Sequence, residues 1–443
     1  MPAQQIDRRD KYCIVGAGPS GLTAAKNFLE AGIGCDVYER EDDVGGNWYY
    51  GKPASSVYRS THLISSKRLT EFVDYPMPAE YPQYPNQFQV HEYLKDYASQ
   101  FGLYEHIQFE TSVESIEREG ELWTVSVSTG KTILYGGVVI ANGHNWDPKQ
   151  PDYTGEFSGK MLHSCEYKTP ELFVGKRVLV VGAGNSGCDI AVEASQNSAK
   201  TFHSVRRAYH YLPKFFRGLP IDHCNERLLR WRIPLWLRRF ITRVGVKIAM
   251  GSPQDYGLPR PDHKLFETHP IINSQLLYHI GHGDIAPKPD IARLDGSQVC
   301  FTDGSREEID IIVWAIGYRI SFPFIDRTHL NVKDGCPRLF LNVFHPQYDN
   351  LFVVGLIQPD SGQWGLTDYQ AQLVARVVQA QAAGSADAER FRRMKRQVNI
   401  DLGSGIQYVN TTRHQLEVEH FSYRNRLKKL IATFPQNSTT ILS

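Results

Sequence analysis

Two short apolar runs mark the beginnings of two similar units in the chain. Residues 12–15 (Tyr-Cys-Ile-Val) and 178–181 (Val-Leu-Val-Val) show no alternation with polar residues. That pattern is typical of a parallel strand buried on both faces of a sheet. Each run is followed by a glycine-rich turn and then by a segment with helical spacing of its apolar residues. Strand, turn and helix in this order predict two nucleotide-binding units of an α/β protein.

Both apolar runs lead into a glycine-rich hexapeptide. The hexapeptides are Gly16-Ala17-Gly18-Pro19-Ser20-Gly21 and Gly182-Ala183-Gly184-Asn185-Ser186-Gly187. In such loops the first glycine allows the tight turn, the second lets the backbone approach a pyrophosphate, and the third lets the helix pack on the strand. The pyrophosphate then lies against the free N–H groups of the following helix. Two loops framed in this way predict two dinucleotide sites.

The residue at the end of the second strand of each unit indicates which dinucleotide that unit binds. Glu39 stands near the ~20-residue spacing at which a carboxylate binds ribose hydroxyls, which favours FAD or NAD in the first unit. In the second unit Ser204 takes the acidic position, and Arg206 and Arg207 follow. Guanidinium groups pair with a 2′-phosphate that a carboxylate would repel. We therefore predict NADPH there, the alternative being that the two arginines are an ordinary solvated pair.

Two glycine-ended apolar strands, 138–140 and 311–315, bracket the second unit, and prolines after the first of them predict a stiff linker. We therefore expect the second unit to be inserted into the first. The predicted fold class is α/β, with two Rossmann-like dinucleotide-binding domains and the NADPH domain inserted into the FAD domain. The expected boundaries are 1–155 for the first part of the FAD domain, 156–307 for the NADPH domain, and 308–443 for the second part of the FAD domain with a C-terminal helical tail.

The stretch 227–250 combines arginines with leucine, tryptophan and isoleucine at helical spacing. A basic amphipathic helix of this kind can lie on an anionic membrane. Pro234 interrupts the pattern. We favour a helical excursion that covers the cleft, with its arginines solvated or paired, over peripheral contact with a membrane.

Charge and composition limit the kinds of partner that we expect the protein to bind. The 443 residues carry 49 Lys and Arg against 48 Asp and Glu, a formal net charge of +1, which supplies no general attraction for nucleic acid. No run approaches the roughly 20 apolar residues that cross a bilayer, the first residues lack the apolar core of a signal peptide, and the end 437–443 is polar. We expect a cytoplasmic protein whose partners are small molecules. The sequence leaves the oligomeric state open, a homodimer being one alternative.

The seven cysteines include no Cys-x-x-Cys pair and no His/Cys cluster at zinc spacing. Two-dinucleotide flavoproteins include disulfide reductases, which need a redox-active cysteine pair. The sequence therefore argues against that class, predicts no metal site, and predicts that most of the cysteines are buried thiols.

The segment 157–167 reads Phe-Ser-Gly-Lys-Met-Leu-His-Ser-Cys-Glu-Tyr and contains His163 and Tyr167. It resembles the Phe-x-Gly-x-x-x-His-x-x-x-Tyr signature of the flavin-containing monooxygenases, which are class B flavoprotein monooxygenases. The resemblance spans nearly the whole chain. It implies that His163 couples the position of the nucleotide to the flavin domain, rather than acting as a general base. Related Baeyer–Villiger enzymes typically carry tryptophan in place of Tyr167.

The resemblance also implies a reaction. NADPH would reduce FAD, the reduced flavin would form a C4a-hydroperoxide with dioxygen, and its distal oxygen would pass to a soft nucleophile such as an amine nitrogen or a sulfide sulfur. The protein would supply positioning, exclusion of water and hydrogen bonds rather than a catalytic triad. The alternatives are Baeyer–Villiger insertion into a ketone, against which Tyr167 weighs, oxidative decarboxylation of an α-keto acid, or uncoupled oxidation of NADPH.

One residue departs from the family pattern. Ile64 stands where these monooxygenases commonly have an asparagine beside the flavin, and an isoleucine cannot replace the hydrogen bond of that amide. Ser65 or Ser66 could supply a hydroxyl instead. We expect Ile64 either to shorten the life of the hydroperoxide and release hydrogen peroxide, or to reshape the substrate pocket. The predicted catalytic residues are Ile64, Ser65, Ser66 and Tyr167. Outside the two glycine loops the predicted cofactor-binding residues are Glu39, Arg40, Gly46, Asn47, Trp48, His163, Ser204, Arg206, Arg207, Gly317 and Gln358.

Overall fold

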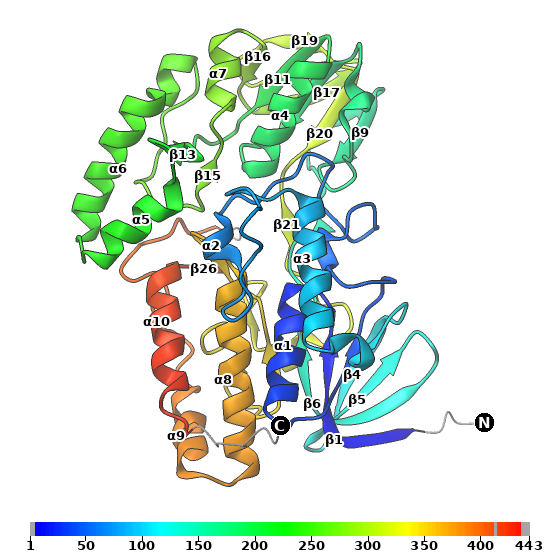
Figure 1. Ribbon diagram of the computed structural model, residues 1–443. Helices are drawn as coiled ribbons and strands as arrows, with labels where there is room; N and C mark the ends of the chain where they lie inside the picture. The colour runs from blue at the N-terminus through cyan, green and yellow to red at the C-terminus, as the bar shows by residue number, and fades with distance from the viewer. Residues whose placement is uncertain (1–4, 412–413, 436–443) are drawn as a thin grey trace.

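Two separate sheets, one in each lobe of the computed structural model, form the framework of the protein (Figure 1). The structure describes residues 5–411 and 414–435, and the polar end 437–443 lies outside the described residues. The sheets belong to the two units that the sequence predicts, which confirms the fold class.

The first sheet occupies the lower lobe of Figure 1. Its strands are β1 (Ile6–Val15), β2 (Cys35–Tyr38), β3 (Ile107–Gln108), β4 (Val113–Glu119), β5 (Leu122–Val127), β6 (Thr132–Ile140) and β24 (Leu351–Val353). They lie in the order β3-β2-β1-β6-β5-β4, with β24 also pairing with β6. The pairs β1–β2, β1–β6, β2–β3 and β6–β24 are parallel, whereas β4, β5 and β6 form an antiparallel meander. The apolar runs 12–15 and 138–140, which predicted strands, form parts of β1 and β6.

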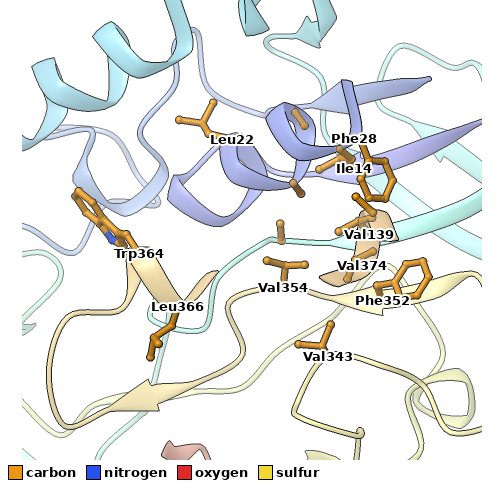
Figure 2. Packing of buried hydrophobic residues seen from close by; sticks show 14 of the residues in the cluster. Ile14, Leu22, Phe28, Val139, Val343, Phe352, Val354, Trp364, Leu366 and Val374 are labelled. Carbon is orange, nitrogen blue, oxygen red and sulfur yellow. The ribbon is translucent and has the colours of Figure 1, made fainter. Parts of the chain in front are cut away.

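Helices cover one face of this sheet and build its largest core. They are α1 (Pro19–Glu30), α2 (Lys67–Thr70), α3 (Gln87–Gln100), α8 (Trp364–Ala382), α9 (Ala386–Met394) and α10 (His420–Ile431). Figure 2 shows Phe28 of α1 beside Ile14 of β1 and Val139 of β6. On this face α1 and α8 pack against each other in one continuous core, which holds the helix that follows the first glycine loop.

The second sheet occupies the upper lobe. Its strands are β9 (Lys160–His163), β10 (Arg177–Val181), β11 (Lys200–Ser204), β16 (Ile285–Lys288) and β20 (Ile311–Trp314), all parallel, in the order β16-β11-β10-β20-β9. Helices α4 (Asn185–Asn197) and α7 (Leu276–Gly281) pack in this lobe. A smaller sheet joins β8 (Gly155–Phe157), β17 (Ile291–Gly296), β18 (Gln298–Phe301) and β19 (Arg306–Glu308).

The position of β20 corrects one predicted boundary. We expected the first domain to resume at residue 308, but β20 pairs with β10 and β9 in the second sheet. An apolar run fits the centre of either sheet equally well, so the sequence alone could not assign it. The chain returns to the first lobe only after Trp314. There β21 (Tyr318–Arg319) pairs with β7 (Asp147–Pro148).

The basic stretch near 227–250 forms two helices, α5 (Ile221–Arg230) and α6 (Leu235–Met250), separated at Pro234 as the sequence predicts. Short strand pairs flank them: β12 (Tyr211–Leu212) with β15 (Ile271–Ile272), and β13 (Phe215–Phe216) with β14 (Leu219–Pro220). In the other lobe β22 (Val332–Lys333) pairs with β23 (Cys336–Pro337), and β25 (Gln358–Pro359) with β26 (Glu417–Val418). None of the helices in the described part of the chain combines the length and apolar character needed to cross a bilayer.

All seven cysteines lie within the described residues and form no disulfide there. Most of their thiols are buried, as predicted, and burial raises the pKa of Cys35 to about 12.

Candidate functional site

The strands of the first sheet end together beneath one crevice. Val15 of β1 lies opposite both Tyr38 of β2 and Ile140 of β6, so the residues after these strands meet at the carboxyl edge. In open parallel sheets ligands bind in the crevice outside this edge.

Contacts within the first glycine loop explain its glycines. Gly16 has a φ of +99°, and a Cβ there would lie 2.9 Å from the carbonyl oxygen of Ala141. A Cβ on Gly21 would lie 1.8 Å from the carbonyl oxygen of Gly16, so only glycine lets α1 approach β1 this closely. Gly18 is the N-cap of α1 and supplies no side-chain cap. The first N–H groups of α1 therefore point to the crevice without a capping side chain.

Glu39 is held against this loop. The Ala17 N–H donates to Glu39 Oε2 (2.7 Å) and the Glu41 N–H donates to Glu39 Oε1 (3.0 Å). Burial raises the pKa of Glu39 against the effect of these two hydrogen bonds. The next residue, Arg40, lies over the ring of Trp146, with 5.3 Å between its guanidinium carbon and the ring centroid.

The second loop repeats this geometry. Gly182 has a φ of +114°, a Cβ on Gly187 would lie 1.9 Å from the carbonyl oxygen of Gly182, and Gly184 begins α4 without a side-chain cap. The Asn185 side chain fixes the loop to β15, since its Oδ1 accepts from the Ile272 N–H (2.8 Å). The two units thus present their loops with the same local structure.

The arginines of the second unit differ in their pairing. Arg207 Nε lies 3.0 Å from Asp262 Oδ1. Arg206 is exposed and has no ion pair within the described residues. The Ser204 hydroxyl donates to the carbonyl oxygen of Pro289 (2.7 Å). Of the two guanidinium groups, that of Arg206 is therefore the more available to a 2′-phosphate.

Both carboxyl edges face one cleft of about 1320 Å³. Most of the predicted site residues line it. They are Gly16, Gly18, Pro19, Ser20, Glu39, Arg40, Gly46, Asn47, Trp48, Ile64, Ser65, Gly182, Gly184, Asn185, Ser186, Ser204, Arg206, Arg207, Gly317 and Gln358. Gly21 and Gly187 lie behind it, where they allow the close packing of helix on strand.

Besides Gly21 and Gly187, three further predicted residues, Tyr167, Ser66 and His163, do not line the cleft. Tyr167 is fully buried in the second lobe, stacks on Phe173 with 5.0 Å between ring centroids, and donates to Glu193 Oε2 (2.6 Å). Ser66 is buried, and its N–H donates to Asp222 Oδ2 (2.7 Å). Neither side chain is among the residues that line the cleft, so the catalytic roles of Tyr167 and Ser66 stay predictions that this geometry does not support.

His163 ends β9 and lies 3.2 Å from the carbonyl oxygen of Gly317, measured from its Nε2. Burial lowers the pKa of His163. Its ring packs edge-on against Tyr318, so it fixes the strand crossing between the lobes instead of lining the cleft. The predicted direct contact with a cofactor is not part of this geometry.

A second, smaller cavity opens beside Ile64. It measures about 140 Å³ and lies between α5, α6 and the first lobe. Ile64 packs against an apolar cluster that includes Leu212 and Ile272. Five residues line both the cavity and the cleft, namely Ile64, Ser65, His269, Pro359 and Ser361. The cavity therefore joins the cleft at the position of the unusual isoleucine.

Sequence reasoning missed several residues at this junction. His144 and His269 both line the cleft, and burial lowers the pKa of His144 to about 4. Asp360 lines the small cavity, where desolvation raises its pKa to about 7. His144 follows a glycine-ended strand and could have been singled out, whereas Asp360 and His269 stand in no pattern that marks them.

The site and the fold identify the class of protein. Residues 9–443 match the model of the flavin-binding monooxygenase-like family, and the chain belongs to this family. It is therefore a flavin-dependent monooxygenase, and the predicted cofactors FAD and NADPH are those of the family. The resemblance drawn from the residues is confirmed.

Several relatives and solved structures are similar over most of their length. Flavin-containing monooxygenase 5 of Rattus norvegicus is 32% identical over 96% of this chain and 84% of its own. Flavin-containing monooxygenase 2 of Homo sapiens is 32% identical over 83% of this chain and 73% of its own. A steroid monooxygenase bound to NADP has a TM-score of 0.70 at 18% identity, over 96% and 98% of the two chains. S-allyl-L-cysteine S-oxygenase from Allium sativum has a TM-score of 0.66 at 20% identity, over 96% and 89%.

Proposed function

We propose that the protein is an NADPH- and O2-dependent FAD monooxygenase that oxygenates soft nucleophiles, an amine nitrogen or a sulfide sulfur. FAD binds at the first glycine loop and NADPH at the second. The observation that carries the proposal is the single cleft lined by both loops, because two dinucleotides bound there can bring their reactive rings together.

The chain's own residues bind and orient the cofactors in this proposal. The uncapped N-termini of α1 and α4 each receive a pyrophosphate. Glu39 binds a ribose of FAD, and Arg206 binds the 2′-phosphate of NADPH. The division into FAD-binding and NADPH-binding domains belongs to the proposal, with the return to the first domain moved beyond β20.

FAD held by the first glycine loop and Glu39 would supply, once reduced, the activation of dioxygen and the oxygen atom that passes to the substrate. The residues near the junction hold the substrate and exclude water. Trp48 supports the cleft wall by packing edge-on against Trp364 at 5.9 Å between ring centroids. This division of labour is consistent with the absence of a Ser/His/Asp arrangement among the sequence motifs.

A direct test combines the holoenzyme with NADPH, a thioether and a tertiary amine. We expect a sulfoxide and an N-oxide, each with one oxygen atom from 18O2. Hydrogen peroxide equal to the NADPH consumed, with no oxygenated product from either compound, would contradict the proposal.

A specific observation favours one second candidate, an uncoupled NADPH oxidase. Ile64 lies at the junction of cleft and cavity and offers no hydrogen bond there. Measuring peroxide and oxygenated product in the same reaction separates the two candidates. The cytoplasmic location and a homodimeric state stay predictions.

A further inference from the structure

An acidic residue from a distant segment lies at the place that we assign to the 2′-phosphate. Arg206 and Arg207 follow β11 and line the cleft there. Asp262, 55 residues after Arg207 in the chain, forms an ion pair with it in which Nε and Oδ1 are 3.0 Å apart. Asp262 stands in the segment between α6 and β15, outside the βαβ pattern of the second unit. The helical excursion therefore brings a negative charge to the predicted nucleotide site of the second lobe.

Two side chains hold the carboxylate of Asp262 in place. The side chain of His263 is 2% exposed, and its Nδ1 lies 2.9 Å from Asp262 Oδ1, the oxygen that Arg207 also contacts. Its Nε2 lies 3.1 Å from Oγ1 of Thr268, a buried residue. The hydrogen bonds from His263 and Arg207 lower the pKa of Asp262 to about 2, so this carboxylate is ionised at neutral pH. Asp262 is thus a charged group in a fixed position, although its own side chain is exposed.

The two guanidinium groups therefore offer unequal charge to a phosphate. Arg206 is exposed, and among the residues that the structure describes it has no ion pair, whereas Asp262 offsets the charge of Arg207 at contact distance. Asp290 also lines the cleft, but its Oδ1 accepts from the Tyr153 hydroxyl (2.8 Å), and within the described chain it forms an ion pair with neither arginine. Asp262 is the carboxylate that controls whether the second guanidinium reaches a ligand.

We propose that Asp262 limits the selectivity of the second site for NADPH over NADH, because it holds Arg207 away from the 2′-phosphate. The inference rests on the proposed function, in which the second glycine loop binds NADPH, and adds a residue that sets the nucleotide selectivity of that loop. A phosphate group at neutral pH carries between one and two negative charges and competes with the carboxylate for the guanidinium. NADH has an uncharged hydroxyl at this place and takes no part in the competition.

The nitrogen atom that Arg207 gives to Asp262 supports competition. An arginine binds a phosphate most strongly through two parallel N–H groups. The Nε of Arg207 already contacts Asp262, so a fork that includes Nε forms only after this contact breaks. An exposed ion pair of this kind changes an equilibrium by up to about fivefold. That factor is the gain in NADPH affinity that we expect when the carboxylate is neutralised.

Nucleotide binding without turnover tests the inference. The FAD-loaded enzyme is titrated calorimetrically with NADP+ and, separately, with NAD+, in the wild type and in Asp262→Asn. The amide keeps the shape of the side chain and removes its charge. Because the Asp262 side chain is 59% exposed, this change leaves the core intact. We expect NADP+ to bind about fivefold more tightly to the variant, and NAD+ to bind equally to both proteins.

Two further variants locate the effect. Asp284→Asn is the matched control, since Asp284 is also exposed and also contacts a histidine, His279 (2.9 Å). It directly precedes β16 and so lies at the amino edge of the second sheet, away from the cleft, where loss of the same charge should change neither affinity. In the background of Arg207→Ala, Asp262→Asn should no longer tighten binding of NADP+, because no guanidinium is left to release.

Four results would overturn the inference. Weaker binding of NADP+ to Asp262→Asn would show that Asp262 orients Arg207 for the phosphate, and unchanged binding would show that it has no influence. An equal gain for NADP+ and NAD+ would separate the effect from the 2′-phosphate, and a gain that persists without Arg207 would mean that Asp262 acts on the phosphate directly. Selectivity that depends on Asp262, together with NADPH oxidation that yields only peroxide, would keep the inference and refute the proposed function.

Discussion

The third glycine of each loop is required by a contact and not by its backbone conformation. A Cβ on Gly21 or Gly187 would lie less than 2 Å from the carbonyl oxygen of the first glycine of the same loop. Such an overlap is relieved only if the helix moves away from the strand, which separates the N-terminus of the helix from its phosphate site.

We therefore expect Gly21→Ala to lose FAD and to destabilise the protein. Overpacking of this kind costs about 1–3 kcal/mol or more. The flavin-to-protein ratio and the thermal midpoint measure both effects. Gly245→Ala in α6 is the control, since its Cβ would lie 3.7 Å from the ring of Phe216 and helix propensity favours alanine by about 1 kcal/mol. Retention of full flavin content and stability in Gly21→Ala would contradict the packing argument.

Ile64, where the small cavity meets the cleft, offers a test of how tightly NADPH oxidation is coupled to formation of the oxygenated product. In Ile64→Asn an amide replaces an apolar side chain at the cleft wall, and one added hydrogen bond of about 1 kcal/mol would change the partition between product and peroxide about fivefold. We expect less peroxide per NADPH. Ile64→Val keeps the wall apolar and should behave as wild type. Equal peroxide yields in all three proteins would show that residue 64 shapes the pocket only.

Arg206 should determine the preference for NADPH. A charge-assisted hydrogen bond contributes about 1.5–3 kcal/mol, so Arg206→Ala should weaken NADPH binding at least tenfold while NADH binding stays the same. Arg207→Ala should have the smaller effect, because Asp262 already pairs with Arg207. Fluorescence titration with both nucleotides gives the comparison. A larger loss of NADPH affinity in Arg207→Ala than in Arg206→Ala would show that Arg207 binds the 2′-phosphate.

The positions of residues whose place follows from the course of the backbone could be predicted from the sequence. The positions of residues whose role depends on the direction of the side chain could not. The glycine loops and Glu39 line the cleft or pack behind it because their spacing from a strand fixes where they lie. Tyr167 stands in the right signature, yet its ring turns into the core. Asp360 becomes notable only because β25 pairs with β26, more than 50 residues further along the chain, and this pairing brings other carboxylates near.

At the scale of elements, α6 shows why the pattern of apolar residues along a helix does not always predict which of its faces lines a cavity. Its residue Val246 lines the small cavity, whereas Trp236, Phe240 and Ile248 are exposed. With apolar residues on both faces, the sequence predicts the helix but not which side covers the cavity. Pro234, by contrast, marks the break between α5 and α6 because proline disfavours a helical conformation in the preceding residue. Membrane contact through the exposed face stays an alternative prediction.

Arg239 holds α6 over the cavity. Its Nε donates to the carbonyl oxygen of Leu265 (2.9 Å) and its Nη2 donates to Glu267 Oε1 (2.9 Å), with both side chains 16% exposed. We expect Arg239→Ala to cost about 1–3 kcal/mol and to speed proteolysis between α5 and α6. Arg230→Ala removes an exposed guanidinium from Glu226, which keeps its pair with Arg68, and should change stability by less than about 0.5 kcal/mol. Equal proteolysis rates for both variants would contradict the role of Arg239.

At the scale of the whole molecule, two lobes with their own cores share one cleft. The direct connection at the crossing is short: β7 pairs with β21, and Arg319 Nη2 lies 2.8 Å from Asp147 Oδ1. The parallel order of each sheet could be predicted from its βαβ pattern. The edge at which the two sheets face each other depends on the pair β7 and β21, and this pair follows β20, which the sequence assigned to the wrong lobe.

A ligand that contacts both lobes should stabilise them together. NADP+ at 100 times its dissociation constant raises the free energy of unfolding by about 2.7 kcal/mol. Adenosine 2′,5′-bisphosphate reaches only the second loop and should stabilise the second lobe alone. We expect urea unfolding of the FAD-loaded enzyme, followed by flavin fluorescence for the first lobe, to shift with NADP+ but not with the bisphosphate. An absence of any shift with NADP+ would mean that the nicotinamide half makes no contact with the flavin lobe, and an equal shift with both ligands would mean that the two lobes unfold as one unit.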